Sequence, residues 1–347
     1  MNFMLDEIRQ QPEIIRNIID RQFHAVEALA TEIKRRKILF GYLAARGTSD
    51  KAAVYGKYVL EINHAIPVAL AAPSVFTVYG AVPHLGPQTL VIGISQSGAA
   101  PDVIEVVRRA REAGALTACI TNEAESELAK AAEFVLLIGA GEERGIAATK
   151  TYTGSLSLLA LLSTALDDEH PERLEHLRRA ADAIEKSLGL DDAVHQLVGR
   201  YVDIDGCIVL GRGFNQCTAM ETALKITETS GISAQSYSAA EFQHGAIAQV
   251  NDGFPCLLFA PDGKAFSAMA SLAGKLRAQH PALICIAHDA AFLAGSETAI
   301  RIPAAVAEWV SPIVYAVAGQ LFSFWLAVAK GLNPDAPRGI EHATKTV

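Results

Sequence analysis

The segment TLVIGISQSGAAPDV (89–103) decides the fold, because an apolar run stops abruptly at small polar residues and the chain restarts at a proline. TLVIG predicts a buried strand, and PDVIEVVRRAREAG predicts a helix with Pro101 at its first position and Gly114 after its end. The residues between them are Ser95, Gln96, Ser97 and Gly98. Small residues between a strand and a helix expose backbone N–H groups at the positive helix end, so this turn predicts an anion site.

The sequence of this turn also limits its ligand. It has neither the lysine of a nucleoside-triphosphate loop nor the glycine triplet of a dinucleotide loop, so a small phosphate monoester is the expected ligand. The alternative is a serine-rich turn that only caps the following helix.

Strands and helices alternate on both sides of this turn. The expected strands are 38–44, 68–72, 89–95, 116–120 and 134–138, and the expected helices include 52–62, 101–114 and 126–132, with RGTSDK (46–51) as a loop. Continuous apolar strands separated by amphipathic helices predict a parallel sheet that is covered on both faces.

The pattern then repeats. Residues 206–229 align with 38–62 when Arg212-Gly213 is set on Arg46-Gly47. We therefore predict an α/β fold of two tandem flavodoxin-like domains, each a parallel sheet with helices on both faces. The expected parts are N-terminal helices (1–35), a first domain (36–168), a helical connector (169–200), a second domain (201–330) and a tail (331–347). The second domain has LLFAPDGKAF (257–266) instead of the serine turn, so only the first is expected to keep the anion chemistry.

Composition excludes several classes of protein. The chain has 347 residues, a formal net charge of −8 and no basic cluster beyond Lys34–Lys37, which argues against a nucleic-acid partner. The N-terminus has carboxylates and no apolar leader, so we expect a cytoplasmic protein. The uncharged segment 309–329 contains prolyl, seryl and glutaminyl interruptions and predicts a buried helix, not a membrane span. The 5 cysteines form no C-x-x-C pair, which predicts reduced thiols; no metal or other cofactor is expected.

Three charged residues of the second half, Glu221, Lys225 and Glu228, have the spacing i, i+4, i+7, which places them on one face of a helix. One interpretation is a solvated Glu–Lys stripe. The apolar neighbours instead favour a buried helix, where charges usually serve a site. These neighbours are Met220, Ala223, Leu224 and Ile226.

Six segments, in this order and spacing, resemble the sugar-isomerase (SIS) family: ARGTSDKA, ISQSGAAPDV, GIAATKTYTGSL, GRGFNQCTAMETALKITET, AEFQHGA and APRGIEHATKTV. The chain is similar to the isomerase portion of glucosamine-6-phosphate synthase and to the free-standing SIS-type glucosamine-6-phosphate deaminases and phosphosugar isomerases. The resemblance runs from about residue 6 to the C-terminus.

The resemblance implies roles for individual residues. It implies that Glu228 transfers the proton, that His244 opens the sugar ring, and that Lys225 with Glu221 supports C1 and C2. It implies that a homodimer shares its active sites, because His244 reaches the neighbouring subunit in relatives. The residues implied to bind a sugar 6-phosphate are Gly47, Thr48, Ser49, Ser95, Gln96, Ser97, Gly98 and Ile146.

Two departures set this chain apart from the synthase pattern. Ala99 and Ala100 stand where the synthase has Glu-Thr, and His342 stands where the synthase tail has a lysine. His342 remains a candidate catalytic residue, because a histidine can still donate a hydrogen bond or move a proton. This chain also shows no glutaminase portion, so the expected reaction converts glucosamine 6-phosphate into fructose 6-phosphate and ammonia by ring opening and C1/C2 proton transfer. The alternatives are an isomerase or deglycase of another amino- or ketosamine-sugar phosphate, and a non-catalytic phosphosugar-sensing module.

Overall fold

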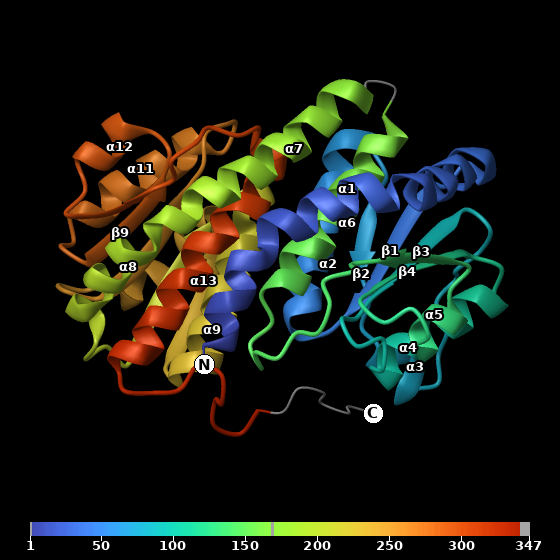
Figure 1. Cartoon of the computed structure of the whole chain (residues 1–347), viewed down its shortest axis with the longest axis horizontal. Helices are drawn as coiled ribbons and strands as arrows, with labels where there is room; N and C mark the ends of the chain where they lie inside the picture. Colours follow the sequence, from blue (N-terminus) through green and yellow to red (C-terminus); the bar gives the residue numbers. More distant parts are fainter. Residues whose placement is uncertain (1, 168–169, 341–347) are drawn as a thin grey trace. The chain divides into compact units, whose positions relative to one another are not determined.

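The computed structural model describes residues 2–167 and 170–340 (Figure 1). By their internal contacts these residues divide into two units, each with its own sheet. We call Glu13–Glu143 with Lys150–Arg178 the serine-loop unit, and the rest, including Arg144–Thr149 and Arg179–Ile340, the α9 unit. The helices α1 (Phe3–Arg36) and α7 (His170–Ser187) contribute residues to both units.

The serine-loop unit has a five-stranded parallel sheet with the order β2-β1-β3-β4-β5. Its strands are β1 (Phe40–Ala45), β2 (Val68–Leu70), β3 (Thr89–Ile94), β4 (Leu116–Thr121) and β5 (Phe134–Leu137). One face packs against α3 (Ser74–Thr77), α4 (Pro101–Glu112) and α5 (Glu127–Ala131). On the other face lie α2 (Gly47–His64) and α6 (Lys150–Leu166), which pack on each other beside Leu43.

The α9 unit repeats this topology with the order β7-β6-β8-β9-β10. Its strands are β6 (Gly206–Gly211), β7 (Ser233–Ser238), β8 (Pro255–Ala260), β9 (Ala282–Ala287) and β10 (Thr298–Arg301). The helices α10 (Ala239–Phe242), α11 (Phe266–Arg277) and α12 (Ala290–Ala294) cover one face. The helices α9 (Gln216–Ser230) and α13 (Ser311–Ala329) pack on each other, and α8 (Asp191–Val198) packs on α13. The predicted tandem α/β architecture is therefore confirmed.

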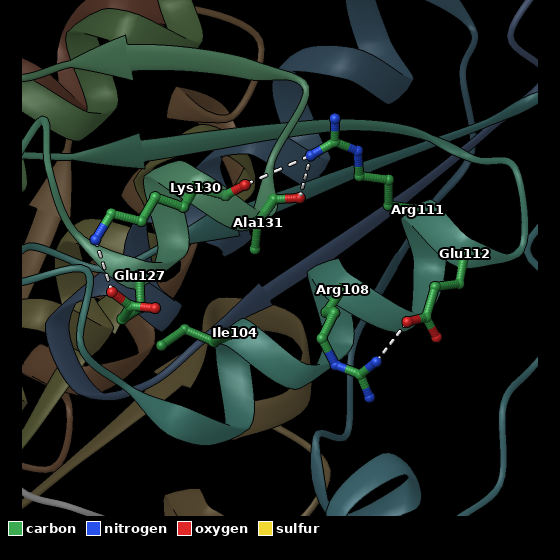
Figure 2. A pocket seen from close by; sticks show the side chains of 7 residues that line it. All are labelled: Ile104, Arg108, Arg111, Glu112, Glu127, Lys130 and Ala131. Carbon is green, nitrogen blue, oxygen red and sulfur yellow. Dashed lines mark hydrogen bonds and ion pairs between the residues drawn. The ribbon is translucent and has the colours of Figure 1, made fainter.

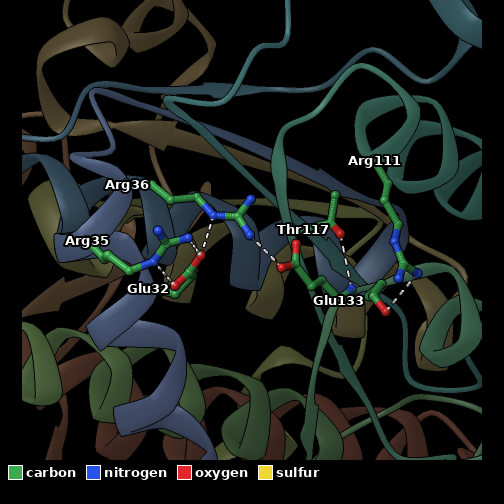
Figure 3. Close-up of polar contacts among 7 residues, drawn as sticks. Glu32, Arg35, Arg36, Arg111, Thr117 and Glu133 are labelled. Atoms are coloured by element: carbon green, nitrogen blue, oxygen red, sulfur yellow. Dashed lines mark hydrogen bonds and ion pairs between the residues drawn. The ribbon is translucent and has the colours of Figure 1, made fainter.

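The C-terminal end of α1 is held by ion pairs within the serine-loop unit (Figure 3). The Arg36 guanidinium donates to Glu32 and to Glu133, the residue before β5, both at 2.5 Å. Hydrogen bonds from Arg35 and Arg36 lower the pKa of Glu32 to about 2. Two arginines of the basic cluster Lys34–Lys37, Arg35 and Arg36, are therefore ion-paired with neighbouring carboxylates.

One sequence expectation about a loop is wrong. RGTSDK was expected to be a loop, but α2 begins at Gly47 and its first turn contains most of that segment. Arg46 remains extended (φ −138°, ψ 156°) as the residue before the helix, and its carbonyl accepts from Asp50 N at 3.3 Å. The polar residues of the segment belong to the first turn of a helix, a position that tolerates them because its N–H groups need acceptors.

Most of the uncharged segment 309–329 forms α13 (Ser311–Ala329), as expected of a buried helix. In the described part of the chain, Glu308–Ala329 is the one helix long and apolar enough to cross a membrane, and 83% of its apolar window is buried inside the protein. Thr229 on α9 donates to the Ser323 carbonyl on α13 at 3.1 Å. Gly319 permits this packing, because a Cβ there would lie 2.1 Å from Thr222 Oγ1.

Candidate functional site

The serine turn follows β3 and is tied to the end of the neighbouring strand β4. Ser95 N donates to the Ile120 carbonyl at 3.0 Å, and Asn122 N donates to the Gln96 carbonyl at 3.0 Å. Gly98 has a left-handed backbone (φ +61°), and a Cβ at this position would lie 2.1 Å from Ser126 Oγ. Only glycine fits this position, so the turn has a defined shape before any ligand binds.

The serines of this turn do not cap the helix that follows. The residue that precedes α4 is Ala100, which has no side-chain acceptor and makes no capping hydrogen bond. Ser97 Oγ accepts only a long bond from Ala99 N at 3.3 Å, and both Gln96 and Ser97 are partly exposed. The capping alternative therefore fails, and the hydroxyl groups have no structural task at the start of α4.

The turn after β1 lies next to the serine turn. Since β1 and β3 are parallel neighbours with Ala45 opposite Ile94, Arg46 and Ser95 are the first residues beyond two adjacent strand ends. Helices α2 and α4 begin directly after these turns, so two positive helix ends meet at one edge of the sheet. Gly47 is exposed with φ +54°, and Thr48 and Ser49 are partly exposed. The structure thus brings the predicted residues 47–49 and 95–98 together.

A charged pair between these two turns was not predicted. Arg46 Nε donates to Asp102 Oδ2 at 2.6 Å, and the Asp102 side chain is only 1% exposed. The sequence signal was an arginine directly before Gly47 and an aspartate directly after Pro101. Neither residue predicts an ion pair until the two turns are known to be neighbours.

The predicted charged row lies inside the α9 unit. The side chains of Glu221 and Lys225 are 2% and 1% exposed, and that of Glu228 is 19% exposed. Lys225 Nζ donates to the Glu228 carboxylate and lies 3.5 Å from Glu221 Oε1. The solvated-stripe interpretation is wrong, because α13 covers this helix.

His244 and Ile146 lie in other parts of the α9 unit. His244 is exposed after α10, and its backbone N–H donates to the Glu241 carbonyl at 3.0 Å. Ile146 is half-buried in a segment that Glu7 anchors, since the Glu7 carboxylate accepts from Arg144 N at 2.5 Å and from Gly145 N at 3.2 Å. His342 lies outside the described residues. The described start of the tail is held by Asp335, which accepts from Phe3 N and Met4 N.

Two surface hollows of about 530 Å³ each contain none of the predicted site residues. Figure 2 shows the one between α4 and α5, where Lys130 pairs with Glu127 and Arg108 pairs with Glu112. Arg111 donates to the Ala131 carbonyl at 3.1 Å in the same hollow. The cationic side chains of this hollow already donate to acceptors of the protein itself, so the hollow is a poor binding site for an anion. The other, at the amino ends of β8 to β10, is lined by Asp252, Arg277, His280, Pro281, Leu283, Gly295, Ser296 and Glu297.

The sequence profile of the SIS domain matches residues 33–165 and 203–330, one match for each sheet. The chain belongs to the SIS family. Its SIS domains place the predicted phosphate-binding turns in the first repeat and the charged helix α9 in the second.

Similar proteins include two fructose-6-phosphate aminotransferases. The isomerizing glutamine–fructose-6-phosphate aminotransferase of Thermococcus kodakarensis is 34% identical over an alignment of 349 residues, and the match covers 98% of this chain and 57% of that protein. This SIS chain therefore spans little more than half of that relative. The C-terminal domain of the glucosamine-fructose-6-phosphate aminotransferase from Francisella tularensis has a TM-score of 0.88 at 25% identity, covering 97% of this chain and 98% of that one.

A third protein shares the fold. Glucosamine-6-phosphate deaminase from Thermotoga maritima has a TM-score of 0.76 at 22% identity, covering 99% of this chain and 100% of that one.

Among the described residues, no three His, Cys, Asp or Glu side chains gather as a metal site would require.

Proposed function

We propose that this SIS protein is a phosphosugar isomerase of the deaminating kind, which converts glucosamine 6-phosphate and water into fructose 6-phosphate and ammonia. The names of its relatives support a hexose 6-phosphate and an amino sugar as the substrate class. The two serine- and glycine-bearing turns support a phosphate monoester, since two helix ends and several hydroxyl donors converge there. The active unit is proposed to be a homodimer.

The observation that carries the proposal is the arrangement of Lys225 and Glu228 on α9. A carboxylate that is 19% exposed and bonded to a buried ammonium group is fixed in position yet still accessible. Proton transfer between two adjacent carbons needs such a fixed base. A sensing module needs no buried row of charges, so this arrangement favours catalysis.

The proposed reaction proceeds in three steps. His244 moves the proton that opens the ring, which gives the free aldehyde at C1. Glu228 then takes the proton from C2 and returns it to C1, while the aldehyde oxygen gains a proton and the amino nitrogen loses one. The C2–N bond thereby becomes an imine and C1 becomes a hydroxymethyl group. Lys225 and Glu221 hold Glu228 and the polar atoms of C1 and C2 during this transfer. Water adds to the imine at C2, and ammonia leaves with the bonding electrons, which yields fructose 6-phosphate.

A second candidate is favoured by Ala99 and Ala100. Ala99 is exposed after the serine turn, and neither alanine provides the side-chain donor of the synthase pattern, so the substrate can differ from that of the synthase. The second candidate is an isomerase or deglycase of another amino- or ketosamine-sugar phosphate.

A substrate panel tests both candidates. The protein is incubated with glucosamine 6-phosphate, N-acetylglucosamine 6-phosphate, fructose 6-phosphate and ketosamine 6-phosphates, and both ammonia and ketose are measured. We expect equal amounts of ammonia and fructose 6-phosphate from glucosamine 6-phosphate. The Glu228→Gln variant should form neither product. Turnover of a different amino-sugar phosphate would establish the second candidate. Tight binding without turnover of any panel member would contradict catalysis.

A further inference from the structure

The ion pair between Arg46 and Asp102 joins the two turns that carry the proposed phosphate site. Arg46 follows β1 and precedes Gly47, whereas Asp102 is the second residue of α4. The two residues are 56 positions apart in the sequence, and Arg46 Nε donates to Asp102 Oδ2 at 2.6 Å. The pair therefore fixes the first turn relative to the second.

The two partners differ strongly in exposure. The Asp102 side chain is 1% exposed, whereas the Arg46 side chain is 51% exposed. Asp102 Oδ1 also accepts from Val103 N at 2.9 Å, so the carboxylate is held inside the first turn of α4. An arginine has five N–H donors in a planar fork, and the bond to Asp102 uses the one on Nε. The exposed part of the guanidinium can still bind an anion.

The second repeat provides an internal comparison. Arg212 has the same extended backbone (φ −155°, ψ 149°) before Gly213, but the second residue of α11 is Ser267, not an aspartate. The turn before α11 is occupied by Glu308, whose carboxylate accepts from Lys264 N at 2.8 Å and Ala265 N at 3.0 Å.

This internal carboxylate shows what the turn accommodates. A Cβ at Gly263 would lie 2.3 Å from Glu308 Cδ, so the glycine makes room for the carboxylate. In the second repeat the turn therefore already holds a two-oxygen anion from its own chain. In the first repeat the corresponding turn has hydroxyl groups, a glycine and a half-exposed arginine beside it.

We propose that Arg46 contacts the substrate, donating from its exposed N–H groups to the phosphate of a sugar phosphate bound by the two turns. Asp102 holds the guanidinium in place and is a positioning residue. Arg46 supplies a hydrogen-bond donor to the phosphate, which Ala99 and Ala100 cannot do. The planar guanidinium group matches the geometry of a phosphate better than a lysine ammonium does. This inference rests on the proposed function in that it takes the turns to be the phosphate site.

Four variants separate direct contact from mere charge balance. Titration calorimetry measures how tightly each variant binds glucosamine 6-phosphate and inorganic phosphate. The variants are Arg46→Ala, Arg46→Lys, Asp102→Asn and the Arg46→Ala/Asp102→Asn double variant. The matched control is Arg109→Ala, because Arg109 is ion-paired with Glu105 on the same helix α4. Thermal unfolding establishes that each variant is folded.

We expect Arg46→Ala to weaken phosphosugar binding by about 10- to 100-fold, as loss of a charged hydrogen bond does. Arg46→Lys should bind with intermediate affinity, and Arg109→Ala should bind like the parent protein. The double variant should stay as weak as Arg46→Ala. Recovery of binding in the double variant would overturn the inference, because Arg46 would then only neutralise Asp102.

The failure of this inference is distinguishable from failure of the proposed function. If the parent protein binds phosphosugar, Ser97→Ala weakens that binding and Arg46→Ala does not, only the role of Arg46 is wrong. If the parent protein binds neither phosphosugar nor phosphate, both proposals are wrong.

Discussion

Lys225 lies 1% exposed on α9 and donates a hydrogen bond to the Glu228 carboxylate one turn further along the helix. The same ammonium group lies 3.5 Å from Glu221 Oε1 on the preceding turn. A buried cation between two carboxylates fixes their orientation. This relationship supports the proposed role of Glu228 as a base that is positioned before substrate arrives.

Replacing Glu228 by Gln should abolish catalysis while leaving phosphosugar binding nearly unchanged, because the amide keeps the shape and loses the base. We expect kcat to fall by about 10²- to 10⁴-fold. Exchange of solvent deuterium into C1 and C2, followed by NMR, measures the proton transfer directly. Normal exchange in this variant would remove Glu228 from the mechanism.

The buried row predicts a specific pattern of stability. Lys225→Met should destabilise the protein by about 3–5 kcal/mol, since removing one partner leaves a charge buried without compensation. The Glu221→Gln/Lys225→Met double variant should recover part of this loss, because it removes the buried charge as well. Denaturant unfolding measures both values. A double variant less stable than Lys225→Met would show that Glu221 does not depend on Lys225.

Removing a hydroxyl group from either turn should weaken phosphate recognition. Ser49→Ala and Ser97→Ala should each raise KM for a sugar 6-phosphate by about 10-fold, the effect of one hydrogen bond to a charged group. The control is Ser157→Ala, since Ser157 Oγ donates only to the Thr153 carbonyl within α6 at 2.7 Å. Unchanged KM in both turn variants would leave the turns without a role in binding.

A proposed shared active site predicts complementation between two inactive proteins. His244→Ala and Glu228→Gln protein are mixed in equal amounts under conditions that exchange subunits. If His244 acts in the site of the partner subunit, half of the dimers are mixed and each has one intact site, so about a quarter of the parent activity should return. Absence of any recovery, or a fully active monomer on a sizing column, would contradict shared sites.

The cysteines should be inert to thiol reagents in the native protein. Burial raises the pKa of Cys119, Cys207 and Cys256 to about 12, so at pH 8 only about 10⁻⁴ of each is thiolate. Each of the cysteines Cys119, Cys207, Cys217, Cys256 and Cys285 is free and buried, and should react only after unfolding in guanidinium. Rapid titration of a native thiol would mean that a sheet core opens readily.

Local sequence determined the elements of both repeats. The apolar runs gave parallel strands, Pro101 gave the first residue of α4, and the match of Arg212-Gly213 to Arg46-Gly47 marked the duplication. These features depend on neighbours within a few residues, through steric limits on the backbone and the burial of one helix face. The same reasoning placed Gly98 in the serine turn, where only glycine fits.

The first turn of α2 could not be predicted from the residues of the segment itself. RGTSDK has the composition of a loop, yet α2 begins at Gly47 within it, directly after β1. Tertiary context outweighs weak helix propensity in short segments of this kind.

Tertiary structure alone decided which charges meet. Sequence spacing aligned Glu221, Lys225 and Glu228, but the burial of the row depends on α13, whose Ser323 carbonyl accepts from Thr229 across 94 positions. Arg46 and Asp102 came together only because two strands pair in parallel, and Glu308 entered the second turn from 44 positions away. Electrostatic partners are set by distance and burial in the folded chain, and a sequence carries neither quantity.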